Sequence, residues 1–300
     1  MNIFVTGAGG YIGGSIAMAL VAAGHHVRGL ARSAANAARL RASGIDPVPG
    51  TLDDADVLTR EARVADGVVN TASADHAAAV HALIAGLEGS GKPLLHTSGS
   101  SVIGDDARGQ RQSDRIFDED TPLLVNPSKQ ARRELDLTVL DAARRNIRSA
   151  VICPSLIYGA GRGLNPQSVQ VPFLAANARD KGVVQIVGPG LNVWSNVHID
   201  DVVDLYLLAL AKAPAGAFYF AENGEASFSD IAAAIARRLG LSGIEALPAQ
   251  VAAERWGESK AYFTLGSNSR VRGKRARREL GWAPRHSSLL DWIETELPVA

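Results

Sequence analysis

The sequence predicts an α/β protein of the Rossmann type, with a doubly wound parallel sheet and a smaller, discontinuous C-terminal domain. The chain opens with a short apolar run, residues 2–6, which leads straight into a glycine-rich turn and then into a helical pattern. Apolar runs alternate with helical patterns as far as about residue 155, which is typical of a parallel sheet covered on both faces. After Gly159 this rhythm changes, which indicates a second domain.

The turn after the first strand carries three glycines at intervals of three, Gly7, Gly10 and Gly13. So tight a strand-to-helix turn needs residues that can adopt a positive φ. A phosphate needs bare backbone to approach, and the start of a helix offers unpaired N–H groups and the positive end of a dipole. The turn therefore predicts a pyrophosphate cradle for a dinucleotide, with Tyr11 and Ile12 at the helix start included in it.

The first half of the chain predicts six strands connected by helices and loops. Strands are expected at residues 2–6, 26–31, 46–48, 67–71, 93–98 and 149–153. Helices are expected at residues 12–23, 34–43, 54–62, 76–89 and 127–146, and residues 104–122 are expected to form a loop. Ligands of such sheets bind at the carboxyl ends of the strands, so the residues that follow each strand are the candidate site.

The second half predicts a mixed domain that binds the substrate. Helices are expected at residues 171–181, from 197–201 to about 212, and at 227–239, 249–258, 274–280 and 287–297. Strands are expected at residues 183–187 and 217–221. We assign residues 1–160 to the dinucleotide-binding domain and 161–300 mainly to the substrate domain, with parts of 192–215 returning to the first.

Composition excludes several classes of protein. The 31 basic and 31 acidic residues cancel, so no basic field is available to hold nucleic acid. The single cysteine, Cys153, excludes an internal disulfide and a cysteine-built metal site, and it fits a reducing compartment. The N-terminus enters a strand at once and no run reaches the roughly 18 apolar residues of a membrane span. We expect a cytoplasmic protein that binds a small molecule and no metal.

The end of the second strand distinguishes the two nicotinamide cofactors. NAD needs a carboxylate there for its ribose hydroxyls, whereas NADP needs a cation for its 2′-phosphate. The strand ends without an acid and Arg32 follows it, which predicts NADP because a guanidinium can fork onto a phosphate. Leu52 and Asp53 end the third strand, and Asp53 either accepts from the adenine amino group or caps the next helix. The residues after the fourth strand are expected beneath the cofactor: Asn70, Thr71 and Ala72.

In this order the motifs resemble the extended short-chain dehydrogenase/reductases, the NAD-dependent epimerase/dehydratase-like group. The resemblance rests on residues 6–13, Leu52-Asp53, the serine-rich residues 97–104, residues 154–159, residues 197–201 and residues 280–284. Cys153 stands where that family usually has an arginine before residues 154–159. The resemblance implies that Pro154 and Leu156 contact the cofactor, and that a homodimer forms through helices 76–89 and 127–146.

The family's chemistry uses a Tyr-x-x-x-Lys pair, in which the tyrosine exchanges a proton with the substrate, and a serine that hydrogen-bonds the substrate oxygen. A phenol is a poor base at neutral pH until a nearby cation stabilises the phenolate. Lys129 matches the lysine, but Val125 stands where the tyrosine should be. The usual serine position falls near Gly99, which leaves Ser98 and Ser100 as candidate catalytic residues, with a slight preference for Ser98.

Several side chains are candidates for the missing acid or for the substrate pocket. Lys129 could act alone if a dry pocket lowers its pKa, or it could only bind the ribose. Asp75 and His76 follow the fourth strand, and His76 either supplies an imidazole as the proton-transferring group or begins a helix. Val125 is expected to line the substrate site, and Tyr158 and Trp194 could line it or belong to the core.

The sequence predicts an NADP(H)-dependent reductase or dehydrogenase that acts on a small carbonyl, imine or activated double bond without the usual tyrosine. Hydride would come from the cofactor, while the protein supplies orientation and a polar contact. Two alternatives stay open. One is a nucleotide-sugar epimerase or dehydratase, and the other is a redox sensor that binds NADP without turnover.

Overall fold

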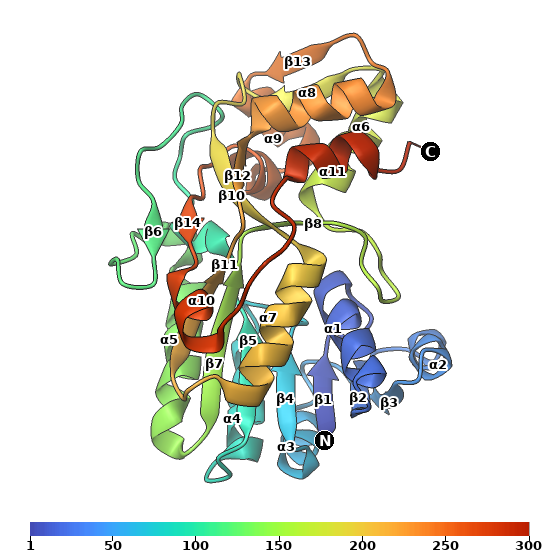
Figure 1. Cartoon of the computed structure of the whole chain (residues 1–300), viewed down its shortest axis with the longest axis vertical. Coiled ribbons are helices and arrows are strands. Elements are labelled where there is room, and N and C mark those ends of the chain that lie inside the picture. The colour runs from blue at the N-terminus through green and yellow to red at the C-terminus, as the bar shows by residue number, and fades with distance from the viewer. Residues whose placement is uncertain (300) are drawn as a thin grey trace.

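The central element of the computed structural model, which describes residues 1–299, is a seven-stranded parallel sheet (Figure 1). Its strand order is β11-β7-β5-β4-β1-β2-β3, so the chain winds outward in both directions from β1. The strands are β1 (Asn2–Thr6), β2 (His26–Ala31), β3 (Asp46–Pro49), β4 (Gly67–Asn70), β5 (Pro93–Thr97), β7 (Arg148–Pro154) and β11 (Ala217–Ala221). The predicted doubly wound α/β fold is confirmed, and the first six strands lie where the sequence predicts them.

Alternation along each strand divides the core into two layers. Ile3 and Val5 pack toward one face and Phe4 toward the other, because successive side chains of a strand point to opposite sides. One face is covered by α1 (Tyr11–Ala22), α2 (Ala34–Ala42) and α7 (Ile199–Lys212). The other is covered by α3 (Ala55–Val64), α4 (Ala77–Leu87) and α5 (Gln130–Asp141). Each layer excludes water from one side of the sheet, so the polar site is confined to the ends of the strands.

The helix expected at residues 127–146 is divided into three parts. A 3-10 turn, Pro127–Lys129, precedes α5, and a second 3-10 turn, Ala142–Arg145, follows it. Pro127 fits the first turn because proline has no N–H to leave unpaired there. Asn146, in a left-handed conformation, ends the segment.

The smaller domain lies above the carboxyl edge of the sheet (Figure 1). Its helices are α6 (Gln170–Lys181), α8 (Phe228–Leu239), α9 (Ala249–Trp256) and α11 (Leu289–Thr295). They pack around two small sheets, made of β8 (Leu156–Tyr158), β10 (Val193–His198) and β12 (Glu225–Ser227), and of β9 (Val184–Val187) and β13 (Ile244–Leu247). A third pair, β6 (Phe117–Asp118) and β14 (Val271–Arg272), joins the loop after β5 to the C-terminal part of the chain.

Several of these short elements escape the sequence prediction. β8, β12 and β6 have only two or three residues, too few for a period to show. The helix expected to start within residues 197–201 begins at Ile199, but the strand β10 before it, which continues through His198, was not expected. The expected loop at residues 104–122 contains β6, and a π-helical segment, Ser259–Thr264, lies between α9 and β14.

The C-terminal half returns to the main sheet further along the chain than expected. α7 covers the sheet beside α1. In addition, β11 supplies the last strand of the sheet by pairing with β7, and α10 (Lys274–Leu280) packs against β11. Segments of the C-terminal half therefore contribute to the main sheet and its covering layer at least as far as residue 280.

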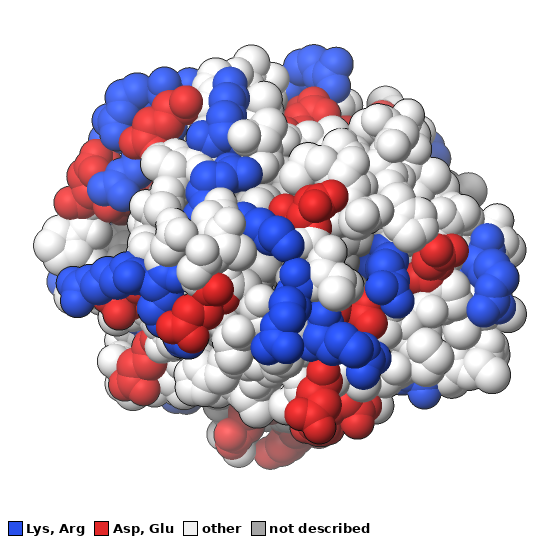
Figure 2. All heavy atoms as spheres, turned by 90° about the horizontal axis from the view of Figure 1, so that it is seen from below, with Lys and Arg blue, Asp and Glu red and all other residues white. Residues whose placement is uncertain are grey.

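Charges of both signs are interspersed on the face of the molecule seen from below (Figure 2). Neighbouring elements are also joined by ion pairs, such as that of Arg145 with Glu88 at 2.6 Å. Among residues 1–299, no helix is both long enough and apolar enough to cross a membrane.

Two distant segments meet at the buried carboxylate of Asp201 on α7. Its oxygens accept the backbone N–H groups of Arg285 and His286 at 2.9 and 3.0 Å. The indole of Trp282 donates to the Asp201 carbonyl at 2.8 Å. These bonds fix the segment between α10 and α11 against α7, and so hold the smaller domain over the sheet.

We expect Asp201→Ala to lower the free energy of unfolding by about 2–4 kcal/mol, because two backbone N–H groups would lose their buried acceptor. The measurement is urea unfolding followed by circular dichroism. Asp204→Ala is the matched control. Its carboxylate pairs with Arg285 at the surface, so we expect a loss of at most about 1 kcal/mol. Equal effects of the two substitutions would contradict this role of Asp201.

Candidate active site

The predicted cradle lies at the carboxyl end of β1. Gly7 has a φ of 75°, the conformation that favours glycine. Gly10 is the N-cap of α1, and no side chain caps the helix there. A Cβ at Gly10 would have only the Gly7 carbonyl oxygen within 4 Å, at 3.2 Å. The turn therefore presents free N–H groups beside open space, which is what a bound phosphate requires.

Gly13 has a different role, because it lets α1 approach the strands closely. A Cβ at Gly13 would lie 2.2 Å from Oγ1 of Thr71 and 2.4 Å from the carbonyl oxygen of Gly7. The Thr71 hydroxyl donates to the Thr6 carbonyl at 2.7 Å, so the Thr71 side chain is held in place beside Gly13. The residues present fit a dinucleotide, since the first two glycines form the cradle and the third sets its depth.

Tyr11 fastens the loop after β8 to the cradle. Its hydroxyl donates to the carbonyl of Gly159 at 2.8 Å, and burial raises the pKa of this phenol. Gly163 lies against Gly14, and Arg162 forms an ion pair with Asp200 at 2.8 Å. The side chain of Ile12 packs against the core beneath the turn. A cofactor contact of Tyr11 through its hydroxyl stays a prediction, and in the structure that group bonds the loop.

The residues predicted to contact the adenosine part follow the ends of β2 and β3. Arg32 is exposed directly after β2, and no ion pair found among residues 1–299 involves it. The Asp53 carboxylate is 87% exposed and pairs with His76 Nε2 at 3.1 Å. Asp53 does not cap the next helix, because the N-cap of α3 is Asp54. His76 begins α4 as expected, since its Nδ1 accepts the N–H of Ala79.

A buried polar row lies below the ends of the central strands. The Thr6 hydroxyl donates to the Asn70 side chain at 2.5 Å, and the Asn70 amide donates to His96 Nδ1 at 2.9 Å. Burial lowers the pKa of His96 to about 4, so this imidazole is neutral at physiological pH. Its Nε2 is buried without a partner. The Asn70 side chain therefore binds Thr6 and His96 inside the protein, and Thr71 and Ala72 form the surface above it.

Both candidate serines are hydrogen-bonded inside the protein. The Ser98 hydroxyl donates to the buried carboxylate of Asp136 at 2.8 Å. Burial raises the pKa of Asp136 to about 6, partly offset by the bond from Ser98. The Ser100 hydroxyl accepts from Ser269 at 2.7 Å. Contact of either serine with a substrate stays a prediction, and this geometry favours a structural role for both.

The space beside Gly99 belongs to an arginine. A Cβ at Gly99, the usual place of the family's serine, would have only Nη1 of Arg132 within 4 Å, at 3.5 Å. Arg132 is held by both oxygens of Asp75, at 2.7 and 2.5 Å, and donates through Nη1 to Ser101 at 3.0 Å. Its side chain is only 14% exposed. Three hydrogen bonds therefore fix the Arg132 guanidinium beside Gly99, where the family's serine hydroxyl is absent.

Lys129 lies one turn before Arg132 on the same side of the helix. Burial and the nearby charge of Arg132 lower the pKa of its ammonium, while Asp75 partly opposes this shift. The ammonium lies 5.9 Å from the ring centre of Phe263 in the π-helical segment. Val125, four residues earlier, is half-buried and supplies no proton-transferring group. Lys129 and Arg132 both lie close enough to Asp75, in the loop after β4, to lower the pKa of its carboxyl.

The remaining predicted contacts lie in the core. Tyr158 is 1% exposed, donates to the His286 carbonyl and packs against His198. The Trp194 indole donates to the Ser267 carbonyl at 2.7 Å. Pro154 and Leu156 are also buried, at the end of β7 and in β8. Burial favours packing over the predicted substrate contacts for Tyr158 and Trp194.

One cluster combines potential metal ligands. Ligand atoms of His198, Asp200 and His286 lie within 4.8 Å of one another, and the two imidazoles stack at 3.9 Å. Nδ1 of His198 accepts the N–H of Asp200, and the Asp200 carboxylate pairs with Arg162. His198 and Asp200 therefore already have partners within the protein, and they link α7 to the loops around it.

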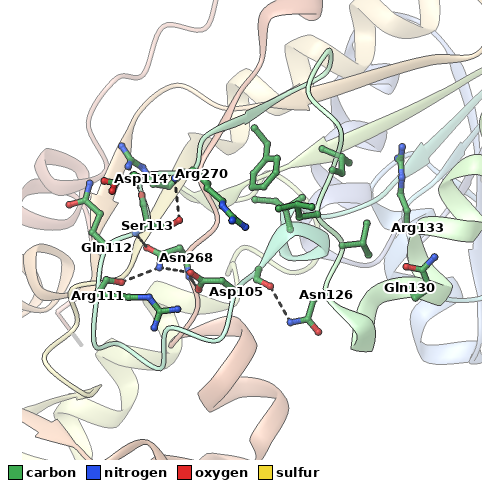
Figure 3. Close-up of a pocket in the computed structure, with 17 residues that line it drawn as sticks. Asp105, Arg111, Gln112, Ser113, Asp114, Asn126, Gln130, Arg133, Asn268 and Arg270 are labelled. Carbon is green, nitrogen blue, oxygen red and sulfur yellow. Dashed lines mark hydrogen bonds between the residues drawn. The ribbon is translucent and has the colours of Figure 1, made fainter.

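A large pocket opens on the other side of the α5 start. Its volume is about 940 Å³, and it lies between the loop of residues 103–126, α5 and the segment around Asn268 and Arg270 (Figure 3). Gln130 and Arg133 come from α5, while Arg111 lies across the pocket on the loop. Val125 also lines it, so the residue in the tyrosine position faces this pocket.

This arrangement of cradle, strand ends and helix is that of a known family. Residues 3–219 match the model of the NAD dependent epimerase/dehydratase family. The chain belongs to that family. It is therefore an enzyme of the short-chain dehydrogenase/reductase type that uses a nicotinamide dinucleotide, as the motifs predict.

Similar proteins span the whole chain. An oxidase of Acremonium is 34% identical over 98% of this chain and 95% of its own length. A 4-hydroxy-2-methyl-3-oxo-4-farnesyl-3,4-dihydroquinoline-1-oxide ketoreductase of Stigmatella aurantiaca is 28% identical over 99% and 97%. The dTDP-glucose 4,6-dehydratase of Bacillus anthracis, solved with NAD, superposes with a TM-score of 0.78 at 18% identity, covering 99% of this chain and 95% of that one. The last likeness shows the shared fold alone.

Sequence reasoning missed Arg132 and Asp136. Arg132 lies three residues after Lys129, and Asp136 lies four residues after Arg132 on α5. Helical periodicity could therefore have placed Arg132 beside Lys129. The absence of a side chain at Gly99 was the second signal for Arg132. Nothing in the sequence signalled the contact of Phe263 with Lys129, because it joins segments more than a hundred residues apart.

We expect Gly10→Ala to weaken NADPH binding by about 10-fold or more with little change in melting temperature, because its methyl group would occupy the phosphate space while meeting only one protein atom. Isothermal titration calorimetry measures the binding. Gly13→Ala is the comparison, since its Cβ would overlap Thr71 and Gly7 and should also lower the melting temperature. Full NADPH affinity in Gly10→Ala would contradict the cradle.

Proposed function

We propose that the protein is an NADP(H)-dependent reductase that acts on a small carbonyl, imine or activated double bond without a catalytic tyrosine. The observation that carries this proposal is the fixed position of Arg132 beside Gly99, with Lys129 one turn away. The relatives named as an oxidase and a ketoreductase support oxidoreductase chemistry. Ser98, Ser100 and Lys129 stay the sequence-predicted catalytic group, and the geometry adds Arg132 to it.

Arg132 is suited to bind the substrate oxygen. When bound, the nicotinamide supplies a hydride to the substrate carbon, so negative charge develops on the oxygen. A guanidinium held by Asp75 and Ser101 is already oriented for that charge and needs no rearrangement during the reaction. Arginine stays protonated in proteins, so this side chain stabilises charge but cannot deliver the proton.

Lys129 is the group that can deliver it. Its pKa is lowered by burial and by Arg132, which makes the ammonium a better acid near neutral pH. The proton passes from the Lys129 ammonium to the substrate oxygen, and solvent returns a proton to the amine. One carbonyl, one NADPH and one proton thus give one alcohol and NADP⁺. For an imine the same proton goes to nitrogen, or the substrate arrives already protonated.

Arg32 supports NADP over NAD. It is exposed next to the adenosine side of the cradle, is without an ion-pair partner among residues 1–299, and stands where NAD enzymes have an acid. Homodimerisation through α4 and α5 and a cytoplasmic location remain predictions. Size-exclusion chromatography with light scattering measures the oligomeric state.

The two alternatives make different demands on the protein. A nucleotide-sugar epimerase or dehydratase keeps its NAD bound through purification, which extraction and analysis of nucleotide from the purified protein would reveal. A sensor binds NADPH but does not oxidise it with any acceptor. NADPH oxidation over a panel of ketones, imines and enones separates the proposed reductase from both.

We expect Arg132→Gln to lower kcat about 100-fold with the best acceptor of that panel, with little change in the KM for NADPH, because a charge-stabilising donor is lost. Losing the Arg132 charge should also raise the pKa of Lys129, so the alkaline fall of kcat should move to higher pH. Arg144→Gln, at the exposed end of the same helical segment, is the control and should retain activity. An unchanged kcat and pH profile in Arg132→Gln would contradict the proposed role.

We expect Arg32→Ala to raise the KM for NADPH at least 10-fold while changing that for NADH less than 2-fold, because only NADPH carries the 2′-phosphate. Steady-state kinetics with both cofactors and one acceptor provide the comparison. Equal effects on the two cofactors would remove the assignment to NADP.

A further inference from the structure

The pocket on the outer side of α5 has an apolar wall, of which Leu124 is the most exposed part. Five of its lining side chains are apolar: Ile103, Phe117, Leu123, Leu124 and Val125. Leu124 is 55% exposed, and it lies in a run of three consecutive apolar residues on a loop. Exposed apolar surface inside a cavity of about 940 Å³ is typical of a binding site for an apolar group.

The charged residues of the pocket divide into those that are paired and those that are not. Asp105 accepts from the backbone and side chain of Asn268, at 2.8 and 3.0 Å. Arg270 is bound by Glu225 at 2.7 Å. These two residues therefore belong to the wall of the pocket, because their hydrogen bonds are already used within the protein.

Three guanidinium groups remain free to meet a ligand. The guanidinium groups of Arg111, Arg115 and Arg133 take part in no hydrogen bond or ion pair found among residues 1–299, although Nη1 of Arg133 is itself buried. Arg133 is instead stacked over the ring of Phe218, at 5.3 Å. The one unpaired acid of the lining is Asp114, so the free cations outnumber the free anions by three to one.

We propose that this pocket binds a small amphiphilic carboxylate, with its apolar body against residues 123–125 and its carboxylate on the free arginines. A guanidinium offers paired donors that match a carboxylate, and Arg111 and Arg115 are exposed on the loop that lines the pocket. The site is separate from the glycine cradle, so the ligand binds whether or not the protein turns over NADPH. It shares α5 with the proposed active site, since Gln130 and Arg133 line the pocket while Lys129 and Arg132 lie toward the strand ends.

The test uses octanoate as a probe, titrated into the whole protein by isothermal titration calorimetry. Octan-1-ol lacks the charge and acetate lacks the apolar body, and we expect each to bind at least 10-fold more weakly than octanoate. Arg111→Gln and Arg115→Gln should each weaken octanoate binding several-fold, and Leu124→Asn should weaken octanoate but not acetate. Arg41→Gln, an exposed arginine outside the pocket, is the matched control and should bind octanoate as the wild type does.

Three results would overturn the proposal. The first is equal binding of octanoate and octan-1-ol, because then charge has no part in recognition. The second is an octanoate affinity that neither arginine variant changes, or no binding at about 10 mM. The third is loss of octanoate binding when NADPH is added, which would place the probe in the cofactor groove. A protein that fails to reduce any acceptor but binds octanoate in the expected manner would refute the proposed reductase and leave this site standing.

Discussion

The contact between α1 and the central strands at Gly13 is the constraint on which the site depends. Only a glycine leaves room there for the Thr71 hydroxyl and the Gly7 carbonyl, both of which would overlap a Cβ. Because α1 sits this close, its first N–H groups reach the edge of the sheet instead of standing above it. The same approach brings Tyr11 to the carbonyl of Gly159, so the loop from the smaller domain closes over the cradle. The absence of a side chain at Gly13 thus determines both the position of the cradle and the position of the loop from the smaller domain.

A second organising element is the start of α5, where consecutive side chains serve different surfaces. Lys129 and Arg132 lie toward the ends of β4 and β5, and Gln130 and Arg133 lie toward the outer pocket. A turn of 100° per residue produces this division without any loop rearrangement. Asp136, one further turn along, fixes the helix to β5 through the Ser98 hydroxyl. This buried hydrogen bond sets the orientation of the helix. It therefore also sets the positions of the side chains on both polar surfaces of the helix.

The sequence predicted the parts of this protein that local chemistry determines. The glycine turn, the alternating strands and the helix after β5 follow from periodicity and backbone freedom within a few residues of each other. The short strands of the smaller domain were missed because they form by pairing across long separations, as β8 does with β10. For the same reason Ser98 looked free in the sequence, whereas its partner Asp136 lies on another element. Asp75 and Arg132 are also far apart in the sequence, so their ion pair could not be predicted from it.

The loss of the tyrosine and the presence of Arg132 are two parts of one electrostatic arrangement. A phenol would combine hydrogen bonding and proton transfer in one group, and no such group stands at residue 125. An arginine can replace only the first task, because it retains its protons. The second must then fall to a group with a depressed pKa, and the charge of Arg132 itself depresses the pKa of Lys129. Asp75 limits this effect while holding the guanidinium in place. In the proposed mechanism, the cation that binds the oxygen is thus also the one that makes its neighbour acidic enough to protonate it.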